Sequence, residues 1–449
     1  MSKKGLAPLM GITEWHCYYM HFYSTKCGAM EDVVDENIDL HKDGGMDVVV
    51  WGAGRATMDY DTKVKGATKT FENGYKGRQR SRPDIAKAML TPCPLRRAIK
   101  RSRERDIPIY VRLSMNRHYT PETPAIWAKF TERNPHAWVR TKSGQMSSQR
   151  MCYAYEEVQN ERVEVLCEIQ RLGADALVLD FARQFPMVLY NEKVTEAFKQ
   201  KTSVDMINFY SKNLEDYTPW HQFRSDIMTG FMKKVKEAVT KQEKALGKKC
   251  PIIARVPDSS PYLMLAYSLD VEAWFKEDLI DATMLTPFPD TIEDLNSYPE
   301  YHVEIAHKYG KKCYGGLGTL GIITPLISFD DADDDDLKRT NTGFYHPKKA
   351  YEIADRQYKA GVDALSLYQT DDLLRLEYPK EMISDIGNKE IVTKRVNELK
   401  EVELNALQEI VGLDWHSYVE LKDGSEPAAS INRSVMSINN ESIQKFLWL

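Results

Sequence analysis

The sequence predicts an α/β protein built on a (β/α)8 TIM barrel, a closed ring of eight parallel strands with helices packed around it. Eight short apolar segments occur along the chain, and amphipathic helical patterns separate most of them. Apolar segments such as Leu177-Val178-Leu179 are continuous rather than alternating, which is typical of parallel strands buried on both faces. No Gly-x-Gly-x-x-Gly motif follows an early strand, so an open dinucleotide-binding sheet lacks its phosphate signature.

The elements follow in order along the chain. The expected strands are residues 6–12, 46–51, 107–113, 174–180, 251–256, 281–285, 312–316 and 362–368. Helical patterns cover residues 30–41, 94–105, 155–172, 221–244, 271–279 and 347–360. Pro94 opens its helix where a missing N–H costs nothing, and Gly361 follows the last helix as a typical cap residue. Long segments after the second, third and fourth strands predict long loops at the C-terminal face, and they span residues 52–91, 118–154 and 183–219.

The length predicts a second, smaller unit after the barrel. The chain has 449 residues, whereas a (β/α)8 barrel typically needs about 250 plus its insertions. We expect a catalytic barrel over residues 1–390 and a small C-terminal appendage over residues 391–449. Residues 391–411 have a helical pattern, and residues 414–449 alternate polar and apolar side chains around a turn, which indicates a helix followed by a small β element.

The composition narrows the class of protein. The net charge of −5 and the lack of a long basic run argue against a nucleic-acid partner. No stretch of about 18 apolar residues occurs, so no membrane partner is expected. The first residues carry no apolar signal-peptide core, which leaves a cytoplasmic protein and an exported protein with its leader removed as alternatives. A homo-oligomer is compatible with the sequence. The seven cysteines are scattered without a Cys-x-x-Cys pair, which favours free thiols.

Polar side chains gather where the expected strands end. In a barrel of parallel strands these ends build the active site, and Asp180 ends the fourth strand there. The alternative reading of Asp180 is a structural cap of the next turn or a partner of Arg183. The other residues at or just after strand ends are Glu14, Trp51, Arg55, Arg112, Asn116, Arg117, Arg183, Arg255, Asp258, Asp290, Tyr368 and Asp371.

This mixture of residue types suits carbohydrate chemistry. Paired carboxylates act as acid, base or nucleophile in glycoside cleavage. Arginine side chains pair bidentately with carboxylate or sulfate, so an anionic sugar also fits. A salt bridge to a neighbouring acid is the alternative role for each single arginine. No His-Glu-x-x-His or similar motif occurs, and we expect neither a metal nor another cofactor.

A family resemblance rests on the fourth strand and the segments after it. Residues 172–186 read LGADALVLDFARQFP, and the similarity continues through Tyr190, Trp220, Arg224, Asp226, residues 254–257, residues 269–274 and residues 361–365. These features resemble the glycosyl-hydrolase-like barrel proteins described as family-10-like. The resemblance implies a TIM barrel with glycosidase activity, and it carries over Asp180, Arg183 and Arg255 as site residues.

The sequence therefore predicts a glycoside hydrolase that cleaves an O-glycosidic bond in an oligo- or polysaccharide, with an anionic glycan as an option. Asp180 is the expected catalytic carboxylate, with Asp258 as first choice of partner, then Glu14, Asp290 and Asp371. The substrate-binding candidates are Trp51, Arg55, Arg112, Asn116, Arg117, Arg183, Arg255, Asp290, Tyr368 and Asp371. Two alternatives stay open, namely a carbohydrate-binding barrel without turnover and a lyase or isomerase acting on an acidic sugar. Retention and inversion also both stay open.

Overall fold

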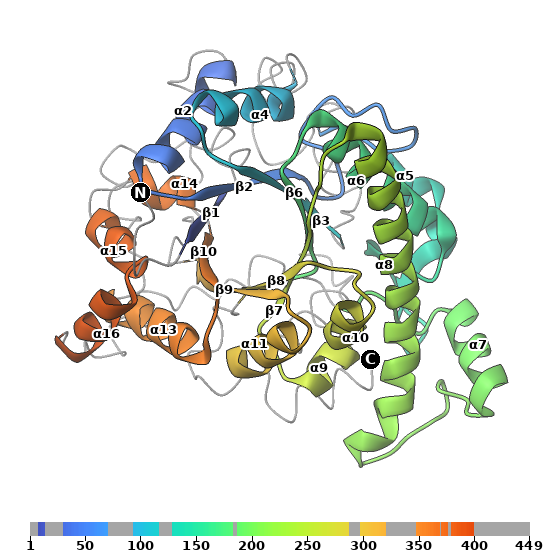
Figure 1. Cartoon of the computed structure of the whole chain (residues 1–449). Helices are drawn as coiled ribbons and strands as arrows, with labels where there is room; N and C mark the ends of the chain where they lie inside the picture. The colour runs from blue at the N-terminus through green and yellow to red at the C-terminus, as the bar shows by residue number, and fades with distance from the viewer. Residues whose placement is uncertain are drawn as a thin grey trace, which may run out of the picture.

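The computed structural model describes residues 8–13, 30–70, 93–115, 128–182, 186–286, 297–319, 347–368, 370–375 and 379–398. Eight parallel strands close a barrel in which each strand pairs with its neighbours in chain order (Figure 1). They are β1 (Leu9–Thr13), β2 (Val48–Gly54), β3 (Ile109–Ser114), β6 (Ala176–Asp180), β7 (Ile252–Pro257), β8 (Ala282–Thr286), β9 (Lys312–Thr319) and β10 (Ala364–Tyr368). Each overlaps an expected strand, and the predicted fold class is confirmed.

Helices surround the barrel on its outside (Figure 1). The main ones are α2 (Met30–Asp43), α4 (Pro94–Glu104), α6 (Glu156–Leu172), α8 (Thr218–Leu246), α10 (Val271–Lys276), α11 (Pro299–Lys308) and α13 (Pro347–Ala360). The other helical elements are α5 (Lys129–Arg133), η2 (Pro135–Ala137), α7 (Glu192–Thr202), η3 (Leu214–Tyr217), α9 (Pro261–Ala266), α14 (Thr370–Arg375), α15 (Pro379–Ile386) and α16 (Lys389–Glu398). In the described residues no helix has both the length and the apolar character that a membrane span requires.

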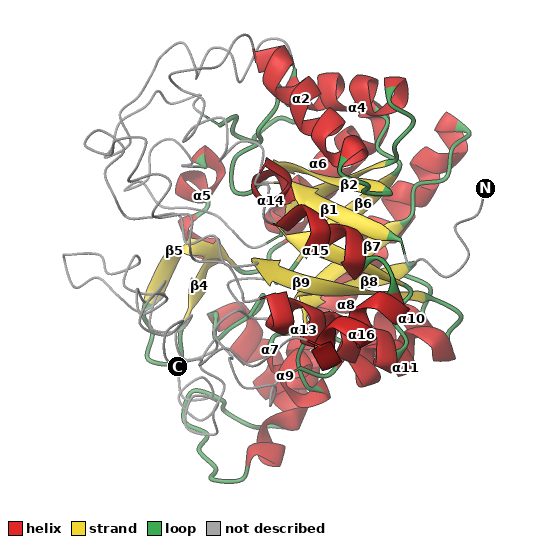
Figure 2. Cartoon of the chain, turned by 90° about the vertical axis from the view of Figure 1, so that its left-hand side faces the viewer, coloured by secondary structure: helices red, strands yellow, loops and turns green. Residues whose placement is uncertain are grey.

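The structure contains elements that the sequence did not predict. The segment expected to be a loop after β3 contains an antiparallel hairpin, β4 (Trp138–Arg140) and β5 (Met146–Met151). Its turn is closed by a 2.8 Å hydrogen bond from the Thr141 N–H to the Gln145 carbonyl, with Gly144 at a positive φ. Helix α11 was not expected, although Pro299 stands at its first turn. In Figure 2 the hairpin and α5 lie on the side toward which the barrel strands point.

The end of the barrel domain is described only in part. Within the predicted helix 391–411, residues up to Glu398 are described, and they belong to α16. Thr393 of α16 donates a 2.7 Å hydrogen bond to Asp355 of α13, and Arg395 donates a 2.9 Å bond to Asp385 of α15. The described part of the predicted helix therefore packs on the barrel helices. Residues 399–449 lie outside the described residues, so the appendage and its boundary stay predictions.

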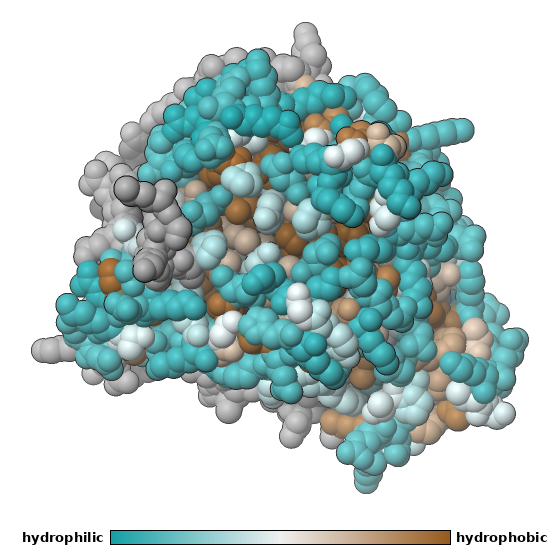
Figure 3. All heavy atoms as spheres, viewed as in Figure 1, coloured by the Kyte–Doolittle hydropathy of each residue, from teal (hydrophilic) through white to brown (hydrophobic). Residues whose placement is uncertain are grey.

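The barrel separates two apolar cores. Inward-facing side chains form one core, which is composed of Met10, Ile12, Val48, Val50, Ala176, Val178, Ile253, Ala282, Met284, Ala364 and Tyr368. Alternate residues of the same strands, such as Val49 and Leu177, belong to the larger core between the barrel and its helices. This alternation follows from the two-residue period of a strand. Hydrophobic residues are visible at the middle of the molecule in Figure 3, with hydrophilic residues over the surrounding helices.

A repeated hydrogen bond ties neighbouring strands together where they begin. The carboxylate of Asp47, just before β2, accepts a 2.9 Å bond from the Leu9 N–H of β1. Asp175 accepts from Ile109 at 3.0 Å, Asp281 from Ile252 at 2.9 Å, and Asp363 from Cys313 at 2.9 Å. Each aspartate thus satisfies an N–H near the start of a strand that precedes its own in the barrel. The strand pairs joined in this way are β1–β2, β3–β6, β7–β8 and β9–β10.

We predict that Asp47→Ala lowers the free energy of unfolding by roughly 1–3 kcal/mol, because it leaves the partly buried Leu9 N–H without its charged acceptor. Asp47→Asn keeps an acceptor and should lose less. Asp43→Ala is the control, since Asp43 is exposed and pairs with Arg105 at the surface, where an ion pair contributes roughly 0–1 kcal/mol. Urea unfolding followed by circular dichroism measures all three variants. Equal losses for Asp47→Ala and Asp43→Ala would contradict the structural role of the strand-start bond.

Candidate functional site

Four polar residues cap the inner core at the carboxyl ends of the strands. On β3, β6 and β7 the inward-facing rows run from Tyr110, Val178 and Ile253 to Arg112, Asp180 and Arg255, two residues further on. Tyr368 ends β10 and also faces inward. We name Arg112, Asp180, Arg255 and Tyr368 the Asp180 cluster. All four residues were predicted from the sequence as site residues, and the structure brings them together.

Asp180 lies between the two arginines. Arg112 Nη1 donates a 2.7 Å hydrogen bond to Asp180 Oδ2, and Arg255 Nη1 lies 3.0 and 2.9 Å from Oδ1 and Oδ2. The Ala182 N–H donates a fourth bond, at 3.0 Å, to Oδ1. The register explains this meeting, because Ser114 of β3 and Arg255 of β7 are the two direct neighbours of Asp180 in the sheet. The carboxylate is thereby fixed in orientation by groups from three segments.

Tyr368 supports both guanidinium groups from the opposite wall. Its ring centroid lies 5.0 Å from Cζ of Arg255 and 5.8 Å from Cζ of Arg112. A cation over an aromatic face at such a distance is attracted by the ring quadrupole. The two arginines are therefore positioned by a carboxylate and by a ring.

The electrostatics of the cluster keep Asp180 ionised. Asp180 is only 6% exposed, and this burial would raise the pKa of its carboxyl. The positive charges of Arg255 and Arg112 and the hydrogen bonds from Arg112 and Ala182 outweigh burial and lower the pKa to about 2. A carboxyl with a lowered pKa is ionised near neutral pH, which suits a fixed negative charge better than a proton donor.

A buried ion pair on α6 shapes the mouth of the barrel, and the sequence analysis missed it. Arg162 Nη1 donates to the carbonyl oxygens of Arg55 at 2.9 Å and Ser114 at 3.2 Å, which lie at the ends of β2 and β3. Glu161 supplies its counter-charge. The signal was present, because Val158, Arg162 and Val165 recur at helical spacing, which places Arg162 on the buried face.

Asp258, the first choice as second carboxylate, lies outside this cluster. Its position continues the outward-facing row of Ala254 and Val256 in β7. Asp258 Oδ1 accepts a 2.7 Å hydrogen bond from the Tyr298 N–H, and Oδ2 accepts a bond from the Ser297 hydroxyl, just before α11. Burial raises the pKa of Asp258 to about 6, although both hydrogen bonds oppose that rise. The raised pKa suits a proton donor, whereas the position suits an anchor for α11.

The other predicted residues are distributed as follows. Trp51 is fully buried in the core between the barrel and the helices, and the structure does not bring it to the Asp180 cluster. Arg55 follows β2 at the mouth, where its carbonyl oxygen is bound by Arg162. Asp371 is buried in α14, three residues after Tyr368. The remaining predicted residues lie outside the described residues, and they are Glu14, Asn116, Arg117, Arg183 and Asp290.

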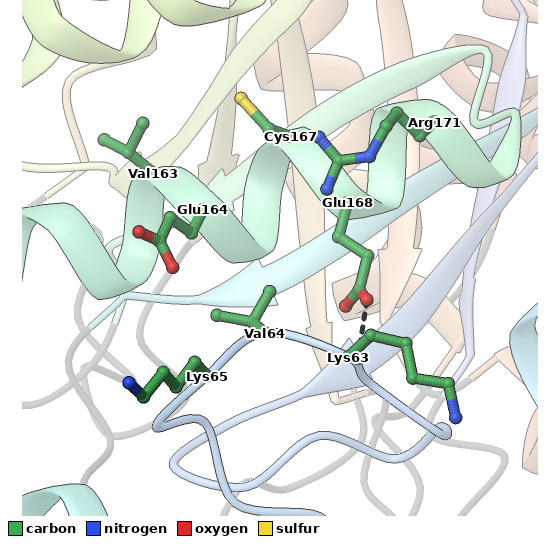
Figure 4. Close-up of a pocket in the computed structure, with 8 residues that line it drawn as sticks. All are labelled: Lys63, Val64, Lys65, Val163, Glu164, Cys167, Glu168 and Arg171. Carbon is green, nitrogen blue, oxygen red and sulfur yellow. Dashed lines mark hydrogen bonds between the residues drawn. The ribbon is translucent and has the colours of Figure 1, made fainter.

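A surface pocket of about 310 Å³ lies elsewhere, between α6 and the segment after β2. It is lined by Lys63, Val64, Lys65, Val163, Glu164, Cys167, Glu168 and Arg171 (Figure 4). Glu168 is already used there, because it accepts hydrogen bonds from the Lys63 N–H and from the hydroxyls of Tyr60 and Thr62. Glu168 in the lining of this pocket therefore holds the segment after β2 against α6. Among the residues described, no group of three or more His, Cys, Asp or Glu side chains could hold a metal ion.

Comparison with known proteins supports the fold. No protein-family model and no curated protein matches the chain. Among solved structures, the alpha-L-fucosidase isoenzyme 2 from Paenibacillus thiaminolyticus is similar with a TM-score of 0.51 and 11% identity over 87% of this chain and 49% of that one. This chain thus spans about half the length of the fucosidase chain. A pneumococcal GH20 exo-beta-D-N-acetylglucosaminidase module matches with a TM-score of 0.44 and 11% identity over 100% of this chain and 97% of that one.

What the fucosidase shares with the chain is the fold. At 11% identity, the fucosidase supports the fold alone. The coarse assignment to TIM-barrel proteins is thus established, and the narrower resemblance to family-10-like proteins stays a prediction. Any function must be argued from the Asp180 cluster and the residues around it.

We predict that Asp258→Asn flattens the pH dependence of stability between about pH 4 and 7. The folded-state pKa of about 6 lies above the ordinary value of 3.8, so this group stabilises the fold fully below about pH 4 and loses that contribution as the pH rises through about 6. Two pKa units correspond to about 3 kcal/mol. The asparagine amide can accept from Tyr298 and donate to Ser297 while staying neutral.

The measurement is the free energy of unfolding in urea at pH 4.5 and pH 7.5 for the wild type and the variant. Between pH 4.5 and pH 7.5, the free energy of unfolding of the variant should rise relative to that of the wild type by up to about 3 kcal/mol. Parallel behaviour of the two proteins would show that Asp258 is not buried as an acid with a raised pKa.

Proposed function

We propose that this protein is a glycoside hydrolase that cleaves an O-glycosidic bond in an oligo- or polysaccharide. The observation that carries the proposal is the Asp180 cluster, an ionised carboxylate fixed by two arginines at the carboxyl ends of the barrel strands. Enzymes with this fold carry their active sites on that face. Carboxylates at such a position serve glycoside cleavage, in which positive charge develops on the sugar ring in the transition state.

Asp180 takes the role of the ionised carboxylate in this proposal. A pKa lowered to about 2 does not suit proton donation near neutral pH, but it leaves a negative charge that can attack or stabilise the anomeric carbon. Arg112 and Arg255 hold the two oxygens in a fixed direction. Their positive charge also makes Asp180 a weaker nucleophile, so a stabilising role competes with nucleophilic attack.

A second carboxylate must supply the proton for the leaving group. Asp258 has a suitable pKa of about 6, but it would have to leave Ser297 and Tyr298 to reach the mouth. Asp371 follows Tyr368 of the cluster by three residues, and Glu14 directly follows the last residue of β1 in the chain. Glu14 and Asp290 lie outside the described residues. We propose Glu14 and Asp371 as the first partners to replace by mutation.

A carbohydrate-binding barrel without turnover is the second candidate. It is favoured by the saturation of Asp180, whose two oxygens accept three bonds from guanidinium groups and one from the backbone. A screen of the full chain against a broad glycan panel discriminates the candidates. New reducing ends without an ultraviolet chromophore indicate hydrolysis, an unsaturated chromophore indicates a lyase, and binding without products indicates a binding module.

We predict that Asp180→Asn lowers the rate of glycan cleavage by about a hundredfold or more, the usual contribution of a catalytic acid, base or nucleophile. The variant also leaves two buried guanidinium groups without their counter-charge, which costs roughly 3–5 kcal/mol. Rates must therefore be compared at a temperature at which circular dichroism shows both proteins folded. Asp43→Asn, an exposed aspartate on α2, is the control and should keep full activity.

A second variant tests whether Asp180 acts as the nucleophile. Asp180→Ala opens space beside the anomeric carbon, so added azide should restore cleavage and yield a glycosyl azide if Asp180 is the nucleophile. A folded Asp180→Asn variant that keeps more than half of the wild-type rate would remove Asp180 from the chemistry and leave it a structural ion-pair partner.

A further inference from the structure

One edge of the Arg255 guanidinium makes no hydrogen bond to any residue that the structure describes. Arg255 is 3% exposed, and its Nη1 makes both bonds to Asp180. Its Nε is buried and makes no hydrogen bond. Among the described residues, Nη1 is the only guanidinium nitrogen of Arg255 that donates a hydrogen bond. A buried donor of this kind is costly to leave unsatisfied, so it calls for a ligand or another acceptor.

The geometry of the group says which acceptor would fit. Guanidinium is planar, and the N–H of Nε lies parallel to one N–H of Nη2 along a single edge. Two parallel donors of this kind match two oxygens of a carboxylate or a sulfate, and they form the strongest contacts that an arginine makes. A sugar hydroxyl offers one oxygen, so it would accept from only one of the two parallel N–H donors. The unpaired edge of Arg255 is thus complementary to an oxyanion.

The surroundings hold this edge in place before any ligand arrives. Asp180 fixes Nη1, and the ring of Tyr368, centred 5.0 Å from Cζ, lies against the guanidinium. The strand row places the side chain inside the barrel at its carboxyl end, where substrate enters barrels of this fold. Binding of an acceptor there costs little side-chain conformational entropy, because Arg255 is already immobilised.

We propose that the Nε–Nη2 edge of Arg255 recognises the oxyanion of an acidic sugar residue, either the carboxylate of a uronic acid or a sulfate ester. This inference rests on the proposed function, because it takes the ligand of the barrel mouth to be a glycan. Asp180 is then a positioning residue for Arg255 in addition to its own role. The substrate class narrows accordingly from glycans in general to anionic glycans.

The test compares acidic and neutral oligosaccharides of equal length on the same protein. Oligogalacturonate and a carrageenan oligosaccharide, which is a sulfated galactan without uronic acid, are titrated into the full chain by calorimetry, with a cello-oligosaccharide as the neutral ligand. Arg255→Lys keeps the charge but loses the bidentate edge. Arg103→Lys is the matched control, since Arg103 is exposed on α4 and its side chain, within the described part of the chain, binds the backbone carbonyl of Gly173 alone.

The wild type should bind one of the two acidic ligands at least tenfold more tightly than the neutral one. Arg255→Lys should lower that preference to below threefold, and Arg103→Lys should leave it unchanged. The preference is the ratio of two dissociation constants measured on the same protein preparation. An unfolded fraction of a variant therefore affects both constants equally and leaves the ratio unchanged. Whether the uronate or the sulfate arm shows the preference identifies the oxyanion. An unchanged preference in Arg255→Lys, or no preference in the wild type, overturns the inference.

The outcomes separate this inference from the proposed hydrolase function. Cleavage of neutral glycans with no preference for acidic ones would keep the hydrolase and remove the oxyanion site. Binding of acidic glycans that depends on Arg255, with no cleavage of any glycan, would keep the oxyanion site and favour the binding barrel.

Discussion

A guanidinium group buried inside a protein needs an anion beside it, and the mouth of this barrel buries two of them around one carboxylate. Arg112 and Arg255 reach Asp180 from the two neighbouring strands, β3 and β7, so the ion pairs join three strands where they end. Removing the negative charge would leave two desolvated cations in the barrel interior, which is far more costly than losing a surface pair. The arrangement of the mouth therefore depends on Asp180.

The opposite end of the barrel meets a different physical demand with the same residue type. There Asp47, Asp175, Asp281 and Asp363 accept N–H groups at the starts of neighbouring strands, where the sheet ladder leaves donors unpaired. Those four carboxylates serve stability, whereas Asp180 points into the interior at the end where active sites are built. An aspartate just before a strand and an aspartate at its end thus have different roles, and Asp175 and Asp180 show both on the single strand β6.

The sequence predicted the eight strands because buried parallel strands are continuous apolar runs, a signal that needs no tertiary context. It also predicted all four residues of the Asp180 cluster, since charged or aromatic residues interrupt those runs at their carboxyl ends. The sequence did not separate Asp258 and Trp51 from these four residues. Successive side chains of a strand point alternately into the barrel and out toward the helices, so an error of one residue in placing a strand reverses the predicted direction of every side chain. The β4–β5 hairpin was missed because its second strand, Met-Ser-Ser-Gln-Arg-Met, is mostly polar.

Stability alone gives no reason for the charges at the barrel mouth. Replacing a buried ion triad by well-packed apolar side chains is often neutral or stabilising, and the strands below already show apolar residues such as Val178 and Ile253 in the same inward rows. Among the described residues, the triad also leaves the buried Nε donor of Arg255 without a hydrogen-bond partner. The cluster is also preorganised by Tyr368 and lies at the carboxyl ends of the strands, and both features meet the requirements of a ligand site. The physical argument for function at this site therefore rests on the small contribution that buried ion pairs make to folding stability when compared with apolar side chains.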